Sequence, residues 1–299
     1  MHPELRPFLA MPQEELDFQL SPSLSAKNAD GVLEGMAAET RIAQSAPVIE
    51  FLADIKYGKR PRQKIDVYKP VEKSARLPCL VFVHGGFWQE GDKSVSGFGA
   101  STFTQKGWIY AGLGYTLTPE VTLTQLTEEI AAGVNFVHQN AQDLGIDPTQ
   151  IYLAGHSAGA HLVACLLVDA LTCDVSAKIA GAVLISGVYD LEPIAGSYVS
   201  KRSPIAPAEI LQLSPLRGVP RKDRLVHVIV GADETQAFQI HSRLLVKAWQ
   251  PYLRDLSLHV LPDRDHFDVL HTLSDPKSDT VARVVSWPAL LQRVPRCET

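Results

Sequence analysis

A serine, a histidine and a pair of carboxylates in this chain are of the types that build an activated nucleophile. Ser157 lies in the segment GHSAG (residues 155–159), directly after the apolar run 151–154. A serine hydroxyl becomes a good nucleophile only when a positioned base accepts its proton and an acid orients that base. His266, in a loop just after the apolar run 256–261, is the candidate base. These residues predict hydrolysis through a covalent intermediate on Ser157.

The surroundings of Ser157 match a nucleophile elbow, in which a strand, a sharp turn and a helix follow one another. The turn holds the serine in a strained backbone conformation with its hydroxyl exposed. Gly155 and Gly159 suit this turn, because a Cβ at either position would collide with the neighbouring strand or helix. The motif and its context together predict that Ser157 is the nucleophile.

Two adjacent carboxylates, Asp233 and Glu234, follow the apolar run 225–230. The order serine, acid, histidine along the chain is that of α/β-hydrolases. We choose Glu234 as the acid because it stands three residues after Gly231, the usual spacing from a glycine that ends the strand. Its longer side chain can still reach an imidazole, and Asp233 is then a solvated loop carboxylate.

The segment HGGFW (residues 84–88) supplies a candidate oxyanion hole, since it is similar to the H-G-G-G loop of lipases and esterases. We expect the backbone N–H groups of Gly86 and Phe87 to face the developing negative charge, with the N–H of Ala158 as a third donor. Each such donor is worth about 3 kcal/mol in the transition state. Alone, the two glycines would indicate an ordinary turn. We expect His84 to brace this loop by hydrogen bonding.

The elements that must position these residues alternate along the chain. Apolar runs predict strands, an amphipathic pattern predicts helices, and their alternation predicts a mostly parallel twisted sheet with helices on both faces. Together with the elbow and the order serine, acid, histidine, this indicates an α/β-hydrolase fold. The strands are expected at 65–68, 79–83, 108–113, 151–154, 180–185, 225–230 and 256–261, and the helices at 123–143, 238–252 and 281–291. We expect residues 1–299 to form one domain. Within it, 1–55 form a peripheral N-terminal segment without a strong strand, and 190–222, rich in proline, form a cap or lid insertion.

Composition narrows the function classes. The chain has 299 residues, of which 45% are hydrophobic and 20% charged, and a formal net charge of −5, which argues against nucleic acid as a partner. The sequence contains no run of about 18 apolar residues, which a membrane span requires, and no secretory signal is visible. We therefore expect a cytoplasmic protein. The four cysteines show no metal spacing, and we expect Cys79 and Cys165 to be small core residues. No metal, flavin or nucleotide motif is present, and we expect no cofactor.

The chain resembles the kynurenine formamidases (arylformamidases), a branch of the α/β-hydrolases close to the hormone-sensitive-lipase-type esterases. The resemblance rests on QLSPS (19–23), HGGFW (84–88), GHSAGAH (155–161), SGVYDLEP (186–193) and DHFD (265–268). It departs from the family at Glu234, where many members have Asp, and around 197–213, where the cap matches no pattern of the family.

The resemblance implies that Ser157 attacks the formyl carbon of an N-formyl aniline such as N-formyl-L-kynurenine, and that water then releases formate. It implies a substrate pocket that includes Trp88, Tyr189 and His161. We expect Phe87 and Trp88 to crowd the acyl side and favour formyl, the alternative for Trp88 being a core aromatic under the loop. For His161, a helix histidine satisfied by hydrogen bonds is the favoured alternative.

Two other function classes stay open. One is a carboxylesterase or amidase that uses the same machinery on short acyl esters or aryl amides, including xenobiotics. The other is an inactive hydrolase fold that serves as a binding module, which the complete set of Ser157, Glu234 and His266 disfavours. A small-molecule substrate is the expected partner; the oligomeric state is left open, with a homodimer as one candidate.

Overall fold

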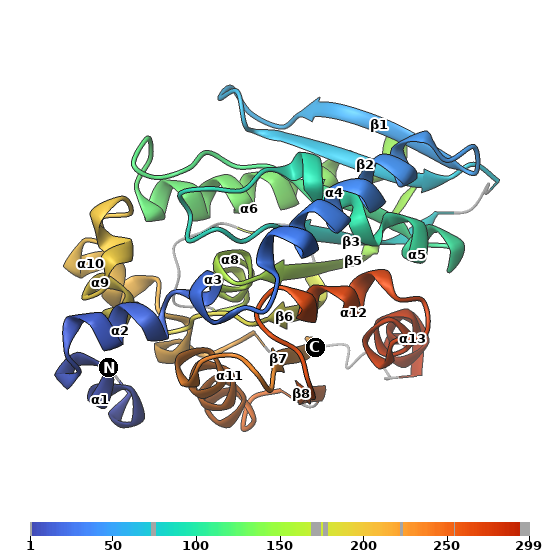
Figure 1. Cartoon of the computed structure of the whole chain (residues 1–299). Coiled ribbons are helices and arrows are strands. Elements are labelled where there is room, and N and C mark those ends of the chain that lie inside the picture. The colour runs from blue at the N-terminus through green and yellow to red at the C-terminus, as the bar shows by residue number, and fades with distance from the viewer. Residues whose placement is uncertain are drawn as a thin grey trace.

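Eight strands form one twisted sheet in the computed structural model, which describes residues 2–72, 76–168, 175, 179–221, 224–253 and 255–293. The order across the sheet is β1-β2-β4-β3-β5-β6-β7-β8 (Figure 1). β2 runs antiparallel to both β1 and β4, and every other neighbouring pair is parallel. The strands are β1 (Ile49–Lys56), β2 (Lys64–Pro70), β3 (Leu77–Val83), β4 (Ile109–Leu113), β5 (Ile146–His156), β6 (Ile179–Ile185), β7 (Leu225–Gly231) and β8 (Asp255–Leu261).

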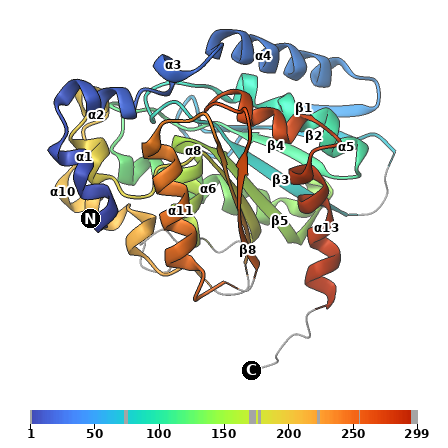
Figure 2. The same cartoon turned by 60° about the horizontal axis from the view of Figure 1, so that its bottom comes forward.

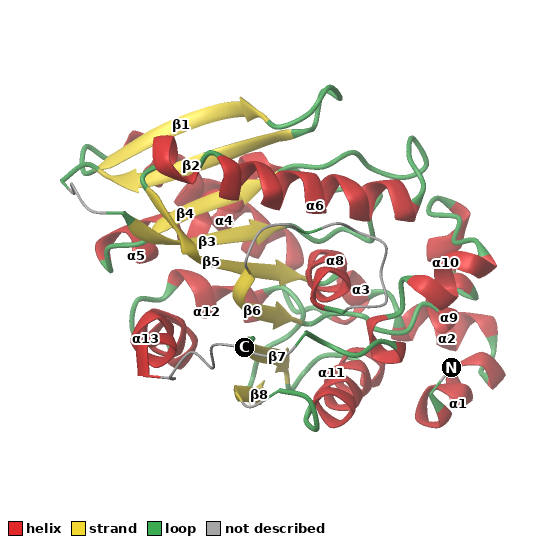
Figure 3. Ribbon diagram, turned by 180° about the vertical axis from the view of Figure 1, so that it is seen from behind, coloured by secondary structure: helices red, strands yellow, loops and turns green. Residues whose placement is uncertain are grey.

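Helices cover both faces of the sheet, because its central strands are apolar on both sides. In β3, Cys79, Val81 and Val83 pack into one hydrophobic core, whereas Leu80 and Phe82 pack into the other. The first core includes α6 (Leu123–Gln139), α8 (Ala158–Leu167) and α11 (Gln236–Trp249). The second includes α4 (Ala29–Ser45), α5 (Ala100–Gln105), α12 (His271–Ser274) and α13 (Asp279–Arg293), as Figure 3 shows from behind. The predicted parallel sheet with helices on both faces is confirmed.

The N-terminal segment differs from expectation in one element, since β1 is a strand where none was predicted. β1 is the edge strand of the sheet, and of its eight residues only Ile49 is buried. An edge strand with so little burial shows no alternation of apolar and polar residues, so its sequence pattern is weak. A second difference is that the helix predicted over 123–143 consists of α6 and the short α7 (Ala141–Leu144).

The first residues of the chain also take part in the core rather than only lying at its edge. Leu5, Phe8, Leu16 and Leu20 are each at most 4% exposed. They belong to η1 (Pro3–Leu5), α1 (Arg6–Ala10), α2 (Gln13–Gln19) and the turn before α3 (Pro22–Ser25). From there the chain crosses above the sheet into α4 (Figure 2).

The segment expected as a cap contains short helices as far as it is described, residue 222 lying outside the described part. They are α9 (Glu192–Ala195), η3 (Tyr198–Lys201), α10 (Pro207–Gln212) and η4 (Pro215–Arg217). α9 and α10 lie beside α1 and α2 (Figures 1 and 3), where the Asp17 carboxylate accepts a hydrogen bond of 2.8 Å from the Tyr198 N–H. The N-terminal helices α1 and α2 thus lie beside the short helices of the segment that was expected as a cap.

Two general observations complete the fold. Of the described helices, none combines the length and apolarity that crossing a bilayer requires. Cys79 and Cys165 are fully buried, as expected of small core side chains, whereas Cys173 and Cys297 lie outside the described residues.

Candidate active site

Ser157 occupies a sharp turn between β5 and α8. Its backbone has φ 54° and ψ −118°, a conformation that L-residues rarely adopt. A Cβ on Gly155 would lie 2.4 Å from the Gly159 oxygen, and one on Gly159 would lie 2.1 Å from the Val83 oxygen. The expected reason for both glycines therefore holds: the turn is too tight for any side chain there.

Glu234 and His266 are joined by a short hydrogen bond, 2.7 Å between His266 Nδ1 and Glu234 Oε2. The second carboxylate oxygen, Oε1, accepts hydrogen bonds from the Gly231 N–H at 2.6 Å and from the Ser186 hydroxyl at 2.5 Å. Glu234 is 5% exposed and His266 2%. Because these hydrogen bonds hold both carboxylate oxygens of Glu234 in place, the carboxylate fixes the orientation of the His266 imidazole.

Asp233, the adjacent carboxylate, lies at the surface instead. Its side chain is 39% exposed and forms an ion pair with Lys27. Between the two adjacent carboxylates, the structure therefore brings Glu234 to the histidine and leaves Asp233 at the surface.

One cavity of about 470 Å³ brings four of the candidate residues together. Ser157, His266, Gly86 and Phe87 all line it, beneath side chains from the N-terminal segment and from η3. The remaining lining residues are Pro22, Ser23, Ala29, Asp30, Leu33, Met36, Phe82, His84, Gly85, Glu90, Gly91, Asp92, Val95, Ser96, His156, Tyr198, Phe267 and Leu270. A small organic substrate fits a space of this size.

The loop after β3 has an unusual backbone, with φ 109° at Gly86, 43° at Phe87 and 62° at Trp88. Three successive residues with positive φ turn the chain sharply at the cavity wall. The turn is held by bonds to its own carbonyls: Gly86 O accepts the Glu90 N–H at 3.1 Å, and Phe87 O accepts the Ser203 hydroxyl at 3.0 Å. Ala158, the third candidate donor, is fully buried at the first position of α8, where backbone N–H groups have no partner within the helix.

Two further histidines in the cavity wall are neutral. Burial lowers the pKa of His84 to about 4, and burial together with the nearby His266 lowers the pKa of His156 well below its usual value. His156 hydrogen-bonds the His266 backbone oxygen through Nε2 at 2.7 Å, so it supports the loop of the candidate base. His84 bonds the Gly85 oxygen at 2.8 Å and stacks on Tyr115, which agrees with a bracing residue.

Three residues expected in the substrate pocket lie elsewhere, and the prediction for them needs correction. Trp88, Tyr189 and His161 are fully buried and do not belong to the described lining of the cavity. Trp88 packs edge-on against His161 with 5.1 Å between ring centroids, and His161 bonds the Leu213 oxygen at 2.7 Å. For Trp88 the physical reason is the loop backbone, whose positive φ accompanies a side chain packed in the core. Phe87 alone of the aromatic pair reaches the cavity.

No role was predicted for Ser186, although it begins the segment SGVYDLEP (186–193), or for the N-terminal contacts to the loops of Glu234 and His266. Ser186 follows β6 directly, and because parallel strands end at one edge of the sheet, that position was a detectable signal. The N-terminal contacts had no local signal. The Lys27 N–H donates to the Asp265 carboxylate at 2.8 Å, and the Thr235 hydroxyl donates to the Gln19 oxygen at 2.7 Å. The segment 19–27 thus holds the loops of both Glu234 and His266.

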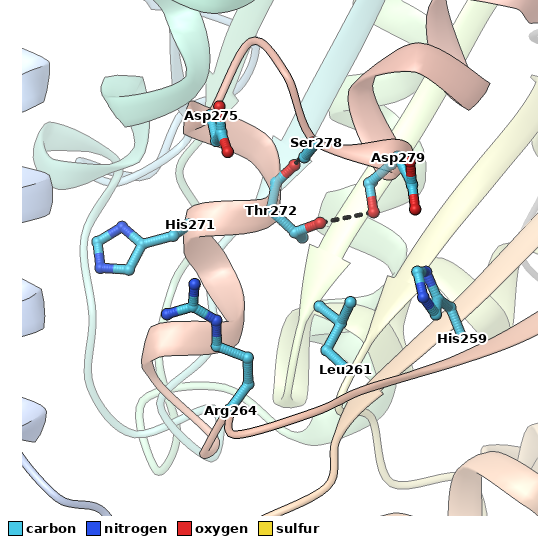
Figure 4. A pocket seen from close by; sticks show the side chains of 9 residues that line it. His259, Leu261, Arg264, His271, Thr272, Asp275, Ser278 and Asp279 are labelled. Carbon is cyan, nitrogen blue, oxygen red and sulfur yellow. Dashed lines mark hydrogen bonds between the residues drawn. The ribbon is translucent and has the colours of Figure 1, made fainter.

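A second hollow of about 170 Å³ lies between β8 and α12 (Figure 4). His259 and His271 stand on opposite sides of it, and the Thr272 hydroxyl donates to the Thr280 hydroxyl at 2.6 Å. This hollow is only about a third as large as the cavity at Ser157. In the described parts of the chain, no group of three His, Cys, Asp or Glu side chains is placed to hold a metal ion.

Comparisons with known proteins support the fold class and show the family. Residues 65–203 match the family model BD-FAE. The chain is 32% identical over 276 residues to a kynurenine formamidase of Danio rerio, covering 89% of this chain and 93% of that protein. A crystal structure from Silicibacter sp., assigned as a thioesterase, superposes with a TM-score of 0.79 at 31% identity, covering 90% of this chain and 98% of that one.

A shorter match joins the chain to a different esterase. It is 35% identical over 124 residues to an isoprenylcysteine alpha-carbonyl methylesterase of Arabidopsis thaliana, covering 42% of this chain and 29% of that protein.

Proposed function

Since this chain belongs to the kynurenine formamidase family of α/β-hydrolases, we propose that it hydrolyses an N-formyl aryl amide, foremost N-formyl-L-kynurenine, to the aromatic amine and formate. The observation that supports this most directly is the hydrogen bond between His266 and Glu234 at the cavity that Ser157 lines. A serine, a buried base and its orienting acid are the machinery for acyl transfer.

The attack begins at Ser157. A carboxylate only accepts hydrogen bonds, so His266 Nδ1 carries the proton toward Glu234, and Nε2 keeps its lone pair as the base. Nε2 accepts the hydroxyl proton as Oγ bonds to the formyl carbon, and the carbonyl π pair moves to the oxygen. The N–H groups of Gly86, Phe87 and Ala158 are the proposed donors to this oxyanion.

The intermediate collapses when the C–N bond breaks and the protonated His266 donates its proton to the leaving aromatic amine. An aniline is a better leaving group than an alkyl amine, so an esterase-like site can cleave this amide. A formyl ester on Ser157 remains. Water then gives its proton to His266 and attacks the ester carbon, Ser157 regains its proton, and formate leaves.

A carboxylesterase is the second candidate function, and two observations favour it. The cavity of about 470 Å³ is larger than a formyl group requires, and the chain is 35% identical to a methylesterase over 124 residues. The same residues would perform the same steps on an ester, with an alcohol as leaving group.

The deciding experiment measures kcat/KM on N-formyl-L-kynurenine, p-nitrophenyl acetate and p-nitrophenyl butyrate. We expect a strong preference for the formyl anilide, and a transient mass increase of one formyl group on the peptide that contains Ser157. Activity restricted to the esters would keep the mechanism and reject the formamidase assignment. The Ser157→Ala variant is the control for any contaminating hydrolase.

A further inference from the structure

The charged side chains in the lining of the catalytic cavity are all acidic. Asp30, Glu90 and Asp92 belong to the described lining, which includes no lysine or arginine. They come from two distant parts of the chain, the first turn of α4 and the segment after the loop 84–88. A cavity with charges of one sign attracts ligand groups of the opposite sign.

Two of these carboxylates are available to a ligand, whereas the third is engaged. Asp92 lies 3.2 Å from the Arg62 guanidinium and accepts the Ser94 N–H at 2.9 Å. Asp30 and Glu90 are exposed, and no ion pair within the described residues involves either of them. Their charges are therefore balanced by solvent until a cation arrives.

Glu90 stands close to the reacting end of the cavity. Its N–H donates to the Gly86 oxygen, and a Cβ on Gly86 would lie only 2.8 Å from Glu90 Cγ. Glu90 thus packs against the loop that carries the proposed oxyanion donors and lines the same cavity as Ser157.

His84 also lines this cavity and has a ring nitrogen without a partner among the described residues. It is 5% exposed, and its Nδ1 must donate to the Gly85 carbonyl, because a carbonyl only accepts. Nε2 is therefore a lone-pair acceptor, and it has no partner among the described residues. Burial holds the pKa of His84 near 4, so this imidazole adds no positive charge to the cavity.

We propose that this cavity selects aryl formamides that carry an ammonium group, with Glu90 and Asp30 as the residues that bind it. This inference rests on the proposed formamidase function and adds the charge of the substrate. In a zwitterion such as N-formyl-L-kynurenine, the ammonium lies toward the two carboxylates and the substrate's own carboxylate toward solvent. A substrate with only a carboxylate is repelled.

Three substrates that differ only in charge test the proposal: N-formyl-L-kynurenine, its decarboxylated analogue with the ammonium alone, and its deaminated analogue with the carboxylate alone. Ion pairs at exposed positions are worth up to about fivefold each. We expect the ammonium analogue to exceed the carboxylate analogue about tenfold in kcat/KM, through KM, with the zwitterion between them. Added salt should reduce the ratio, because exposed charges are screened.

The variants Glu90→Gln and Asp30→Asn should each bring the ratio closer to one. Glu34→Gln is the matched control, since Glu34 is an exposed carboxylate on α4 outside the cavity lining, and it should leave the ratio unchanged. A carboxylate analogue that is cleaved as well as the ammonium analogue, or a ratio that survives both substitutions, would overturn the proposal.

Failure of the proposed function would look different, because all three formamides would be inert. The same charge comparison is then made with phenyl acetates that carry an ammonium or a carboxylate. A preference for the ammonium ester that Glu90→Gln removes supports the charge selection, and its absence rejects it.

Discussion

The bottom and the mouth of the catalytic cavity are built on different principles. At the bottom, Ser157, Glu234 and His266 are at most 5% exposed, and the two partners of the triad candidate are held by short hydrogen bonds to neighbouring backbone and side chains. At the mouth, Leu33 is 41% exposed and Glu90 has no ion pair among the described residues. Positions that must be exact to fractions of an ångström are buried and bonded, whereas positions that choose the substrate are exposed and replaceable.

Removing the nucleophile should give the largest effect of any substitution. Ser157→Ala deletes the atom proposed to form the acyl-enzyme, and we expect kcat to fall by about 10⁵-fold, with the fold intact by circular dichroism. Steady-state kinetics on N-formyl-L-kynurenine measures this. More than a hundredth of the activity remaining would mean that the bottom of the cavity is not the site of the chemistry.

Changing the acid should separate two adjacent carboxylates. Glu234→Gln keeps the shape but loses the charge that stabilises protonated His266, so we expect kcat to fall by about 10³- to 10⁴-fold. The matched control is Asp233→Asn at the neighbouring exposed position, which should change kcat less than twofold. Equal losses in both variants would contradict the division that the hydrogen bonds show.

Acid should destabilise the folded protein through its buried histidines. Burial lowers the pKa of His84, His161 and His241 to about 4 and that of His227 to about 3. The folded protein therefore stays unprotonated at these residues while the unfolded chain takes up protons below about pH 6.5. The free energy of unfolding should decrease as the pH falls from 6.5 toward 4, by about 1 kcal/mol per histidine per pH unit.

Urea denaturation at a series of pH values measures this slope. His241→Gln should make it shallower, because it removes one of the histidines whose pKa is lowered by burial. A stability that is constant between pH 6.5 and 4.5 would show that the buried histidines are protonated in the folded state.

Ser186 should matter less than the triad candidates but more than the mouth. Ser186→Ala removes one donor from Glu234 and leaves the Gly231 N–H in place, so we expect kcat to fall about tenfold. Because Ser186 acts through Glu234, the loss should lie in kcat, with KM unchanged. A rise in KM of the same size would make Ser186 a substrate contact instead.

The smallest effect is expected at the mouth. Leu33→Ala removes a half-exposed apolar side chain from the cavity rim, so KM should rise about two- to threefold through lost apolar contact, with kcat unchanged. Kinetics on N-formyl-L-kynurenine tests this. A loss of kcat would indicate that the mouth, too, positions the reacting groups.

The same contrast explains what could be predicted from the sequence. The elbow at Ser157, the apolar strand runs and the spacing from Gly231 to Glu234 are local patterns, and local patterns survive in a sequence. Side-chain direction at Trp88 depends on three consecutive positive φ angles, which no pattern of residue types reveals for Phe and Trp. The strand β1 was not predicted, because a strand with one buried residue in eight shows no hydrophobic periodicity.

The N-terminal contacts could not be predicted from the sequence for another reason. Lys27 meets Asp265 across 238 positions of sequence, and such a pairing follows from the assembled fold alone. Residues 19–36, which include the family segment QLSPS (19–23), therefore show no pattern that predicts these contacts, although several of them line the cavity.

That separation also sets an order of events during protein synthesis. The segment that carries Gln19 and Lys27 leaves the ribosome early, but the loops it holds, at Thr235 and Asp265, are translated more than two hundred residues later. Contacts of such long range form late in folding. The hydrolytic centre is thus assembled only when nearly the whole polypeptide has emerged, and a nascent or prematurely terminated chain carries the elbow serine without its base.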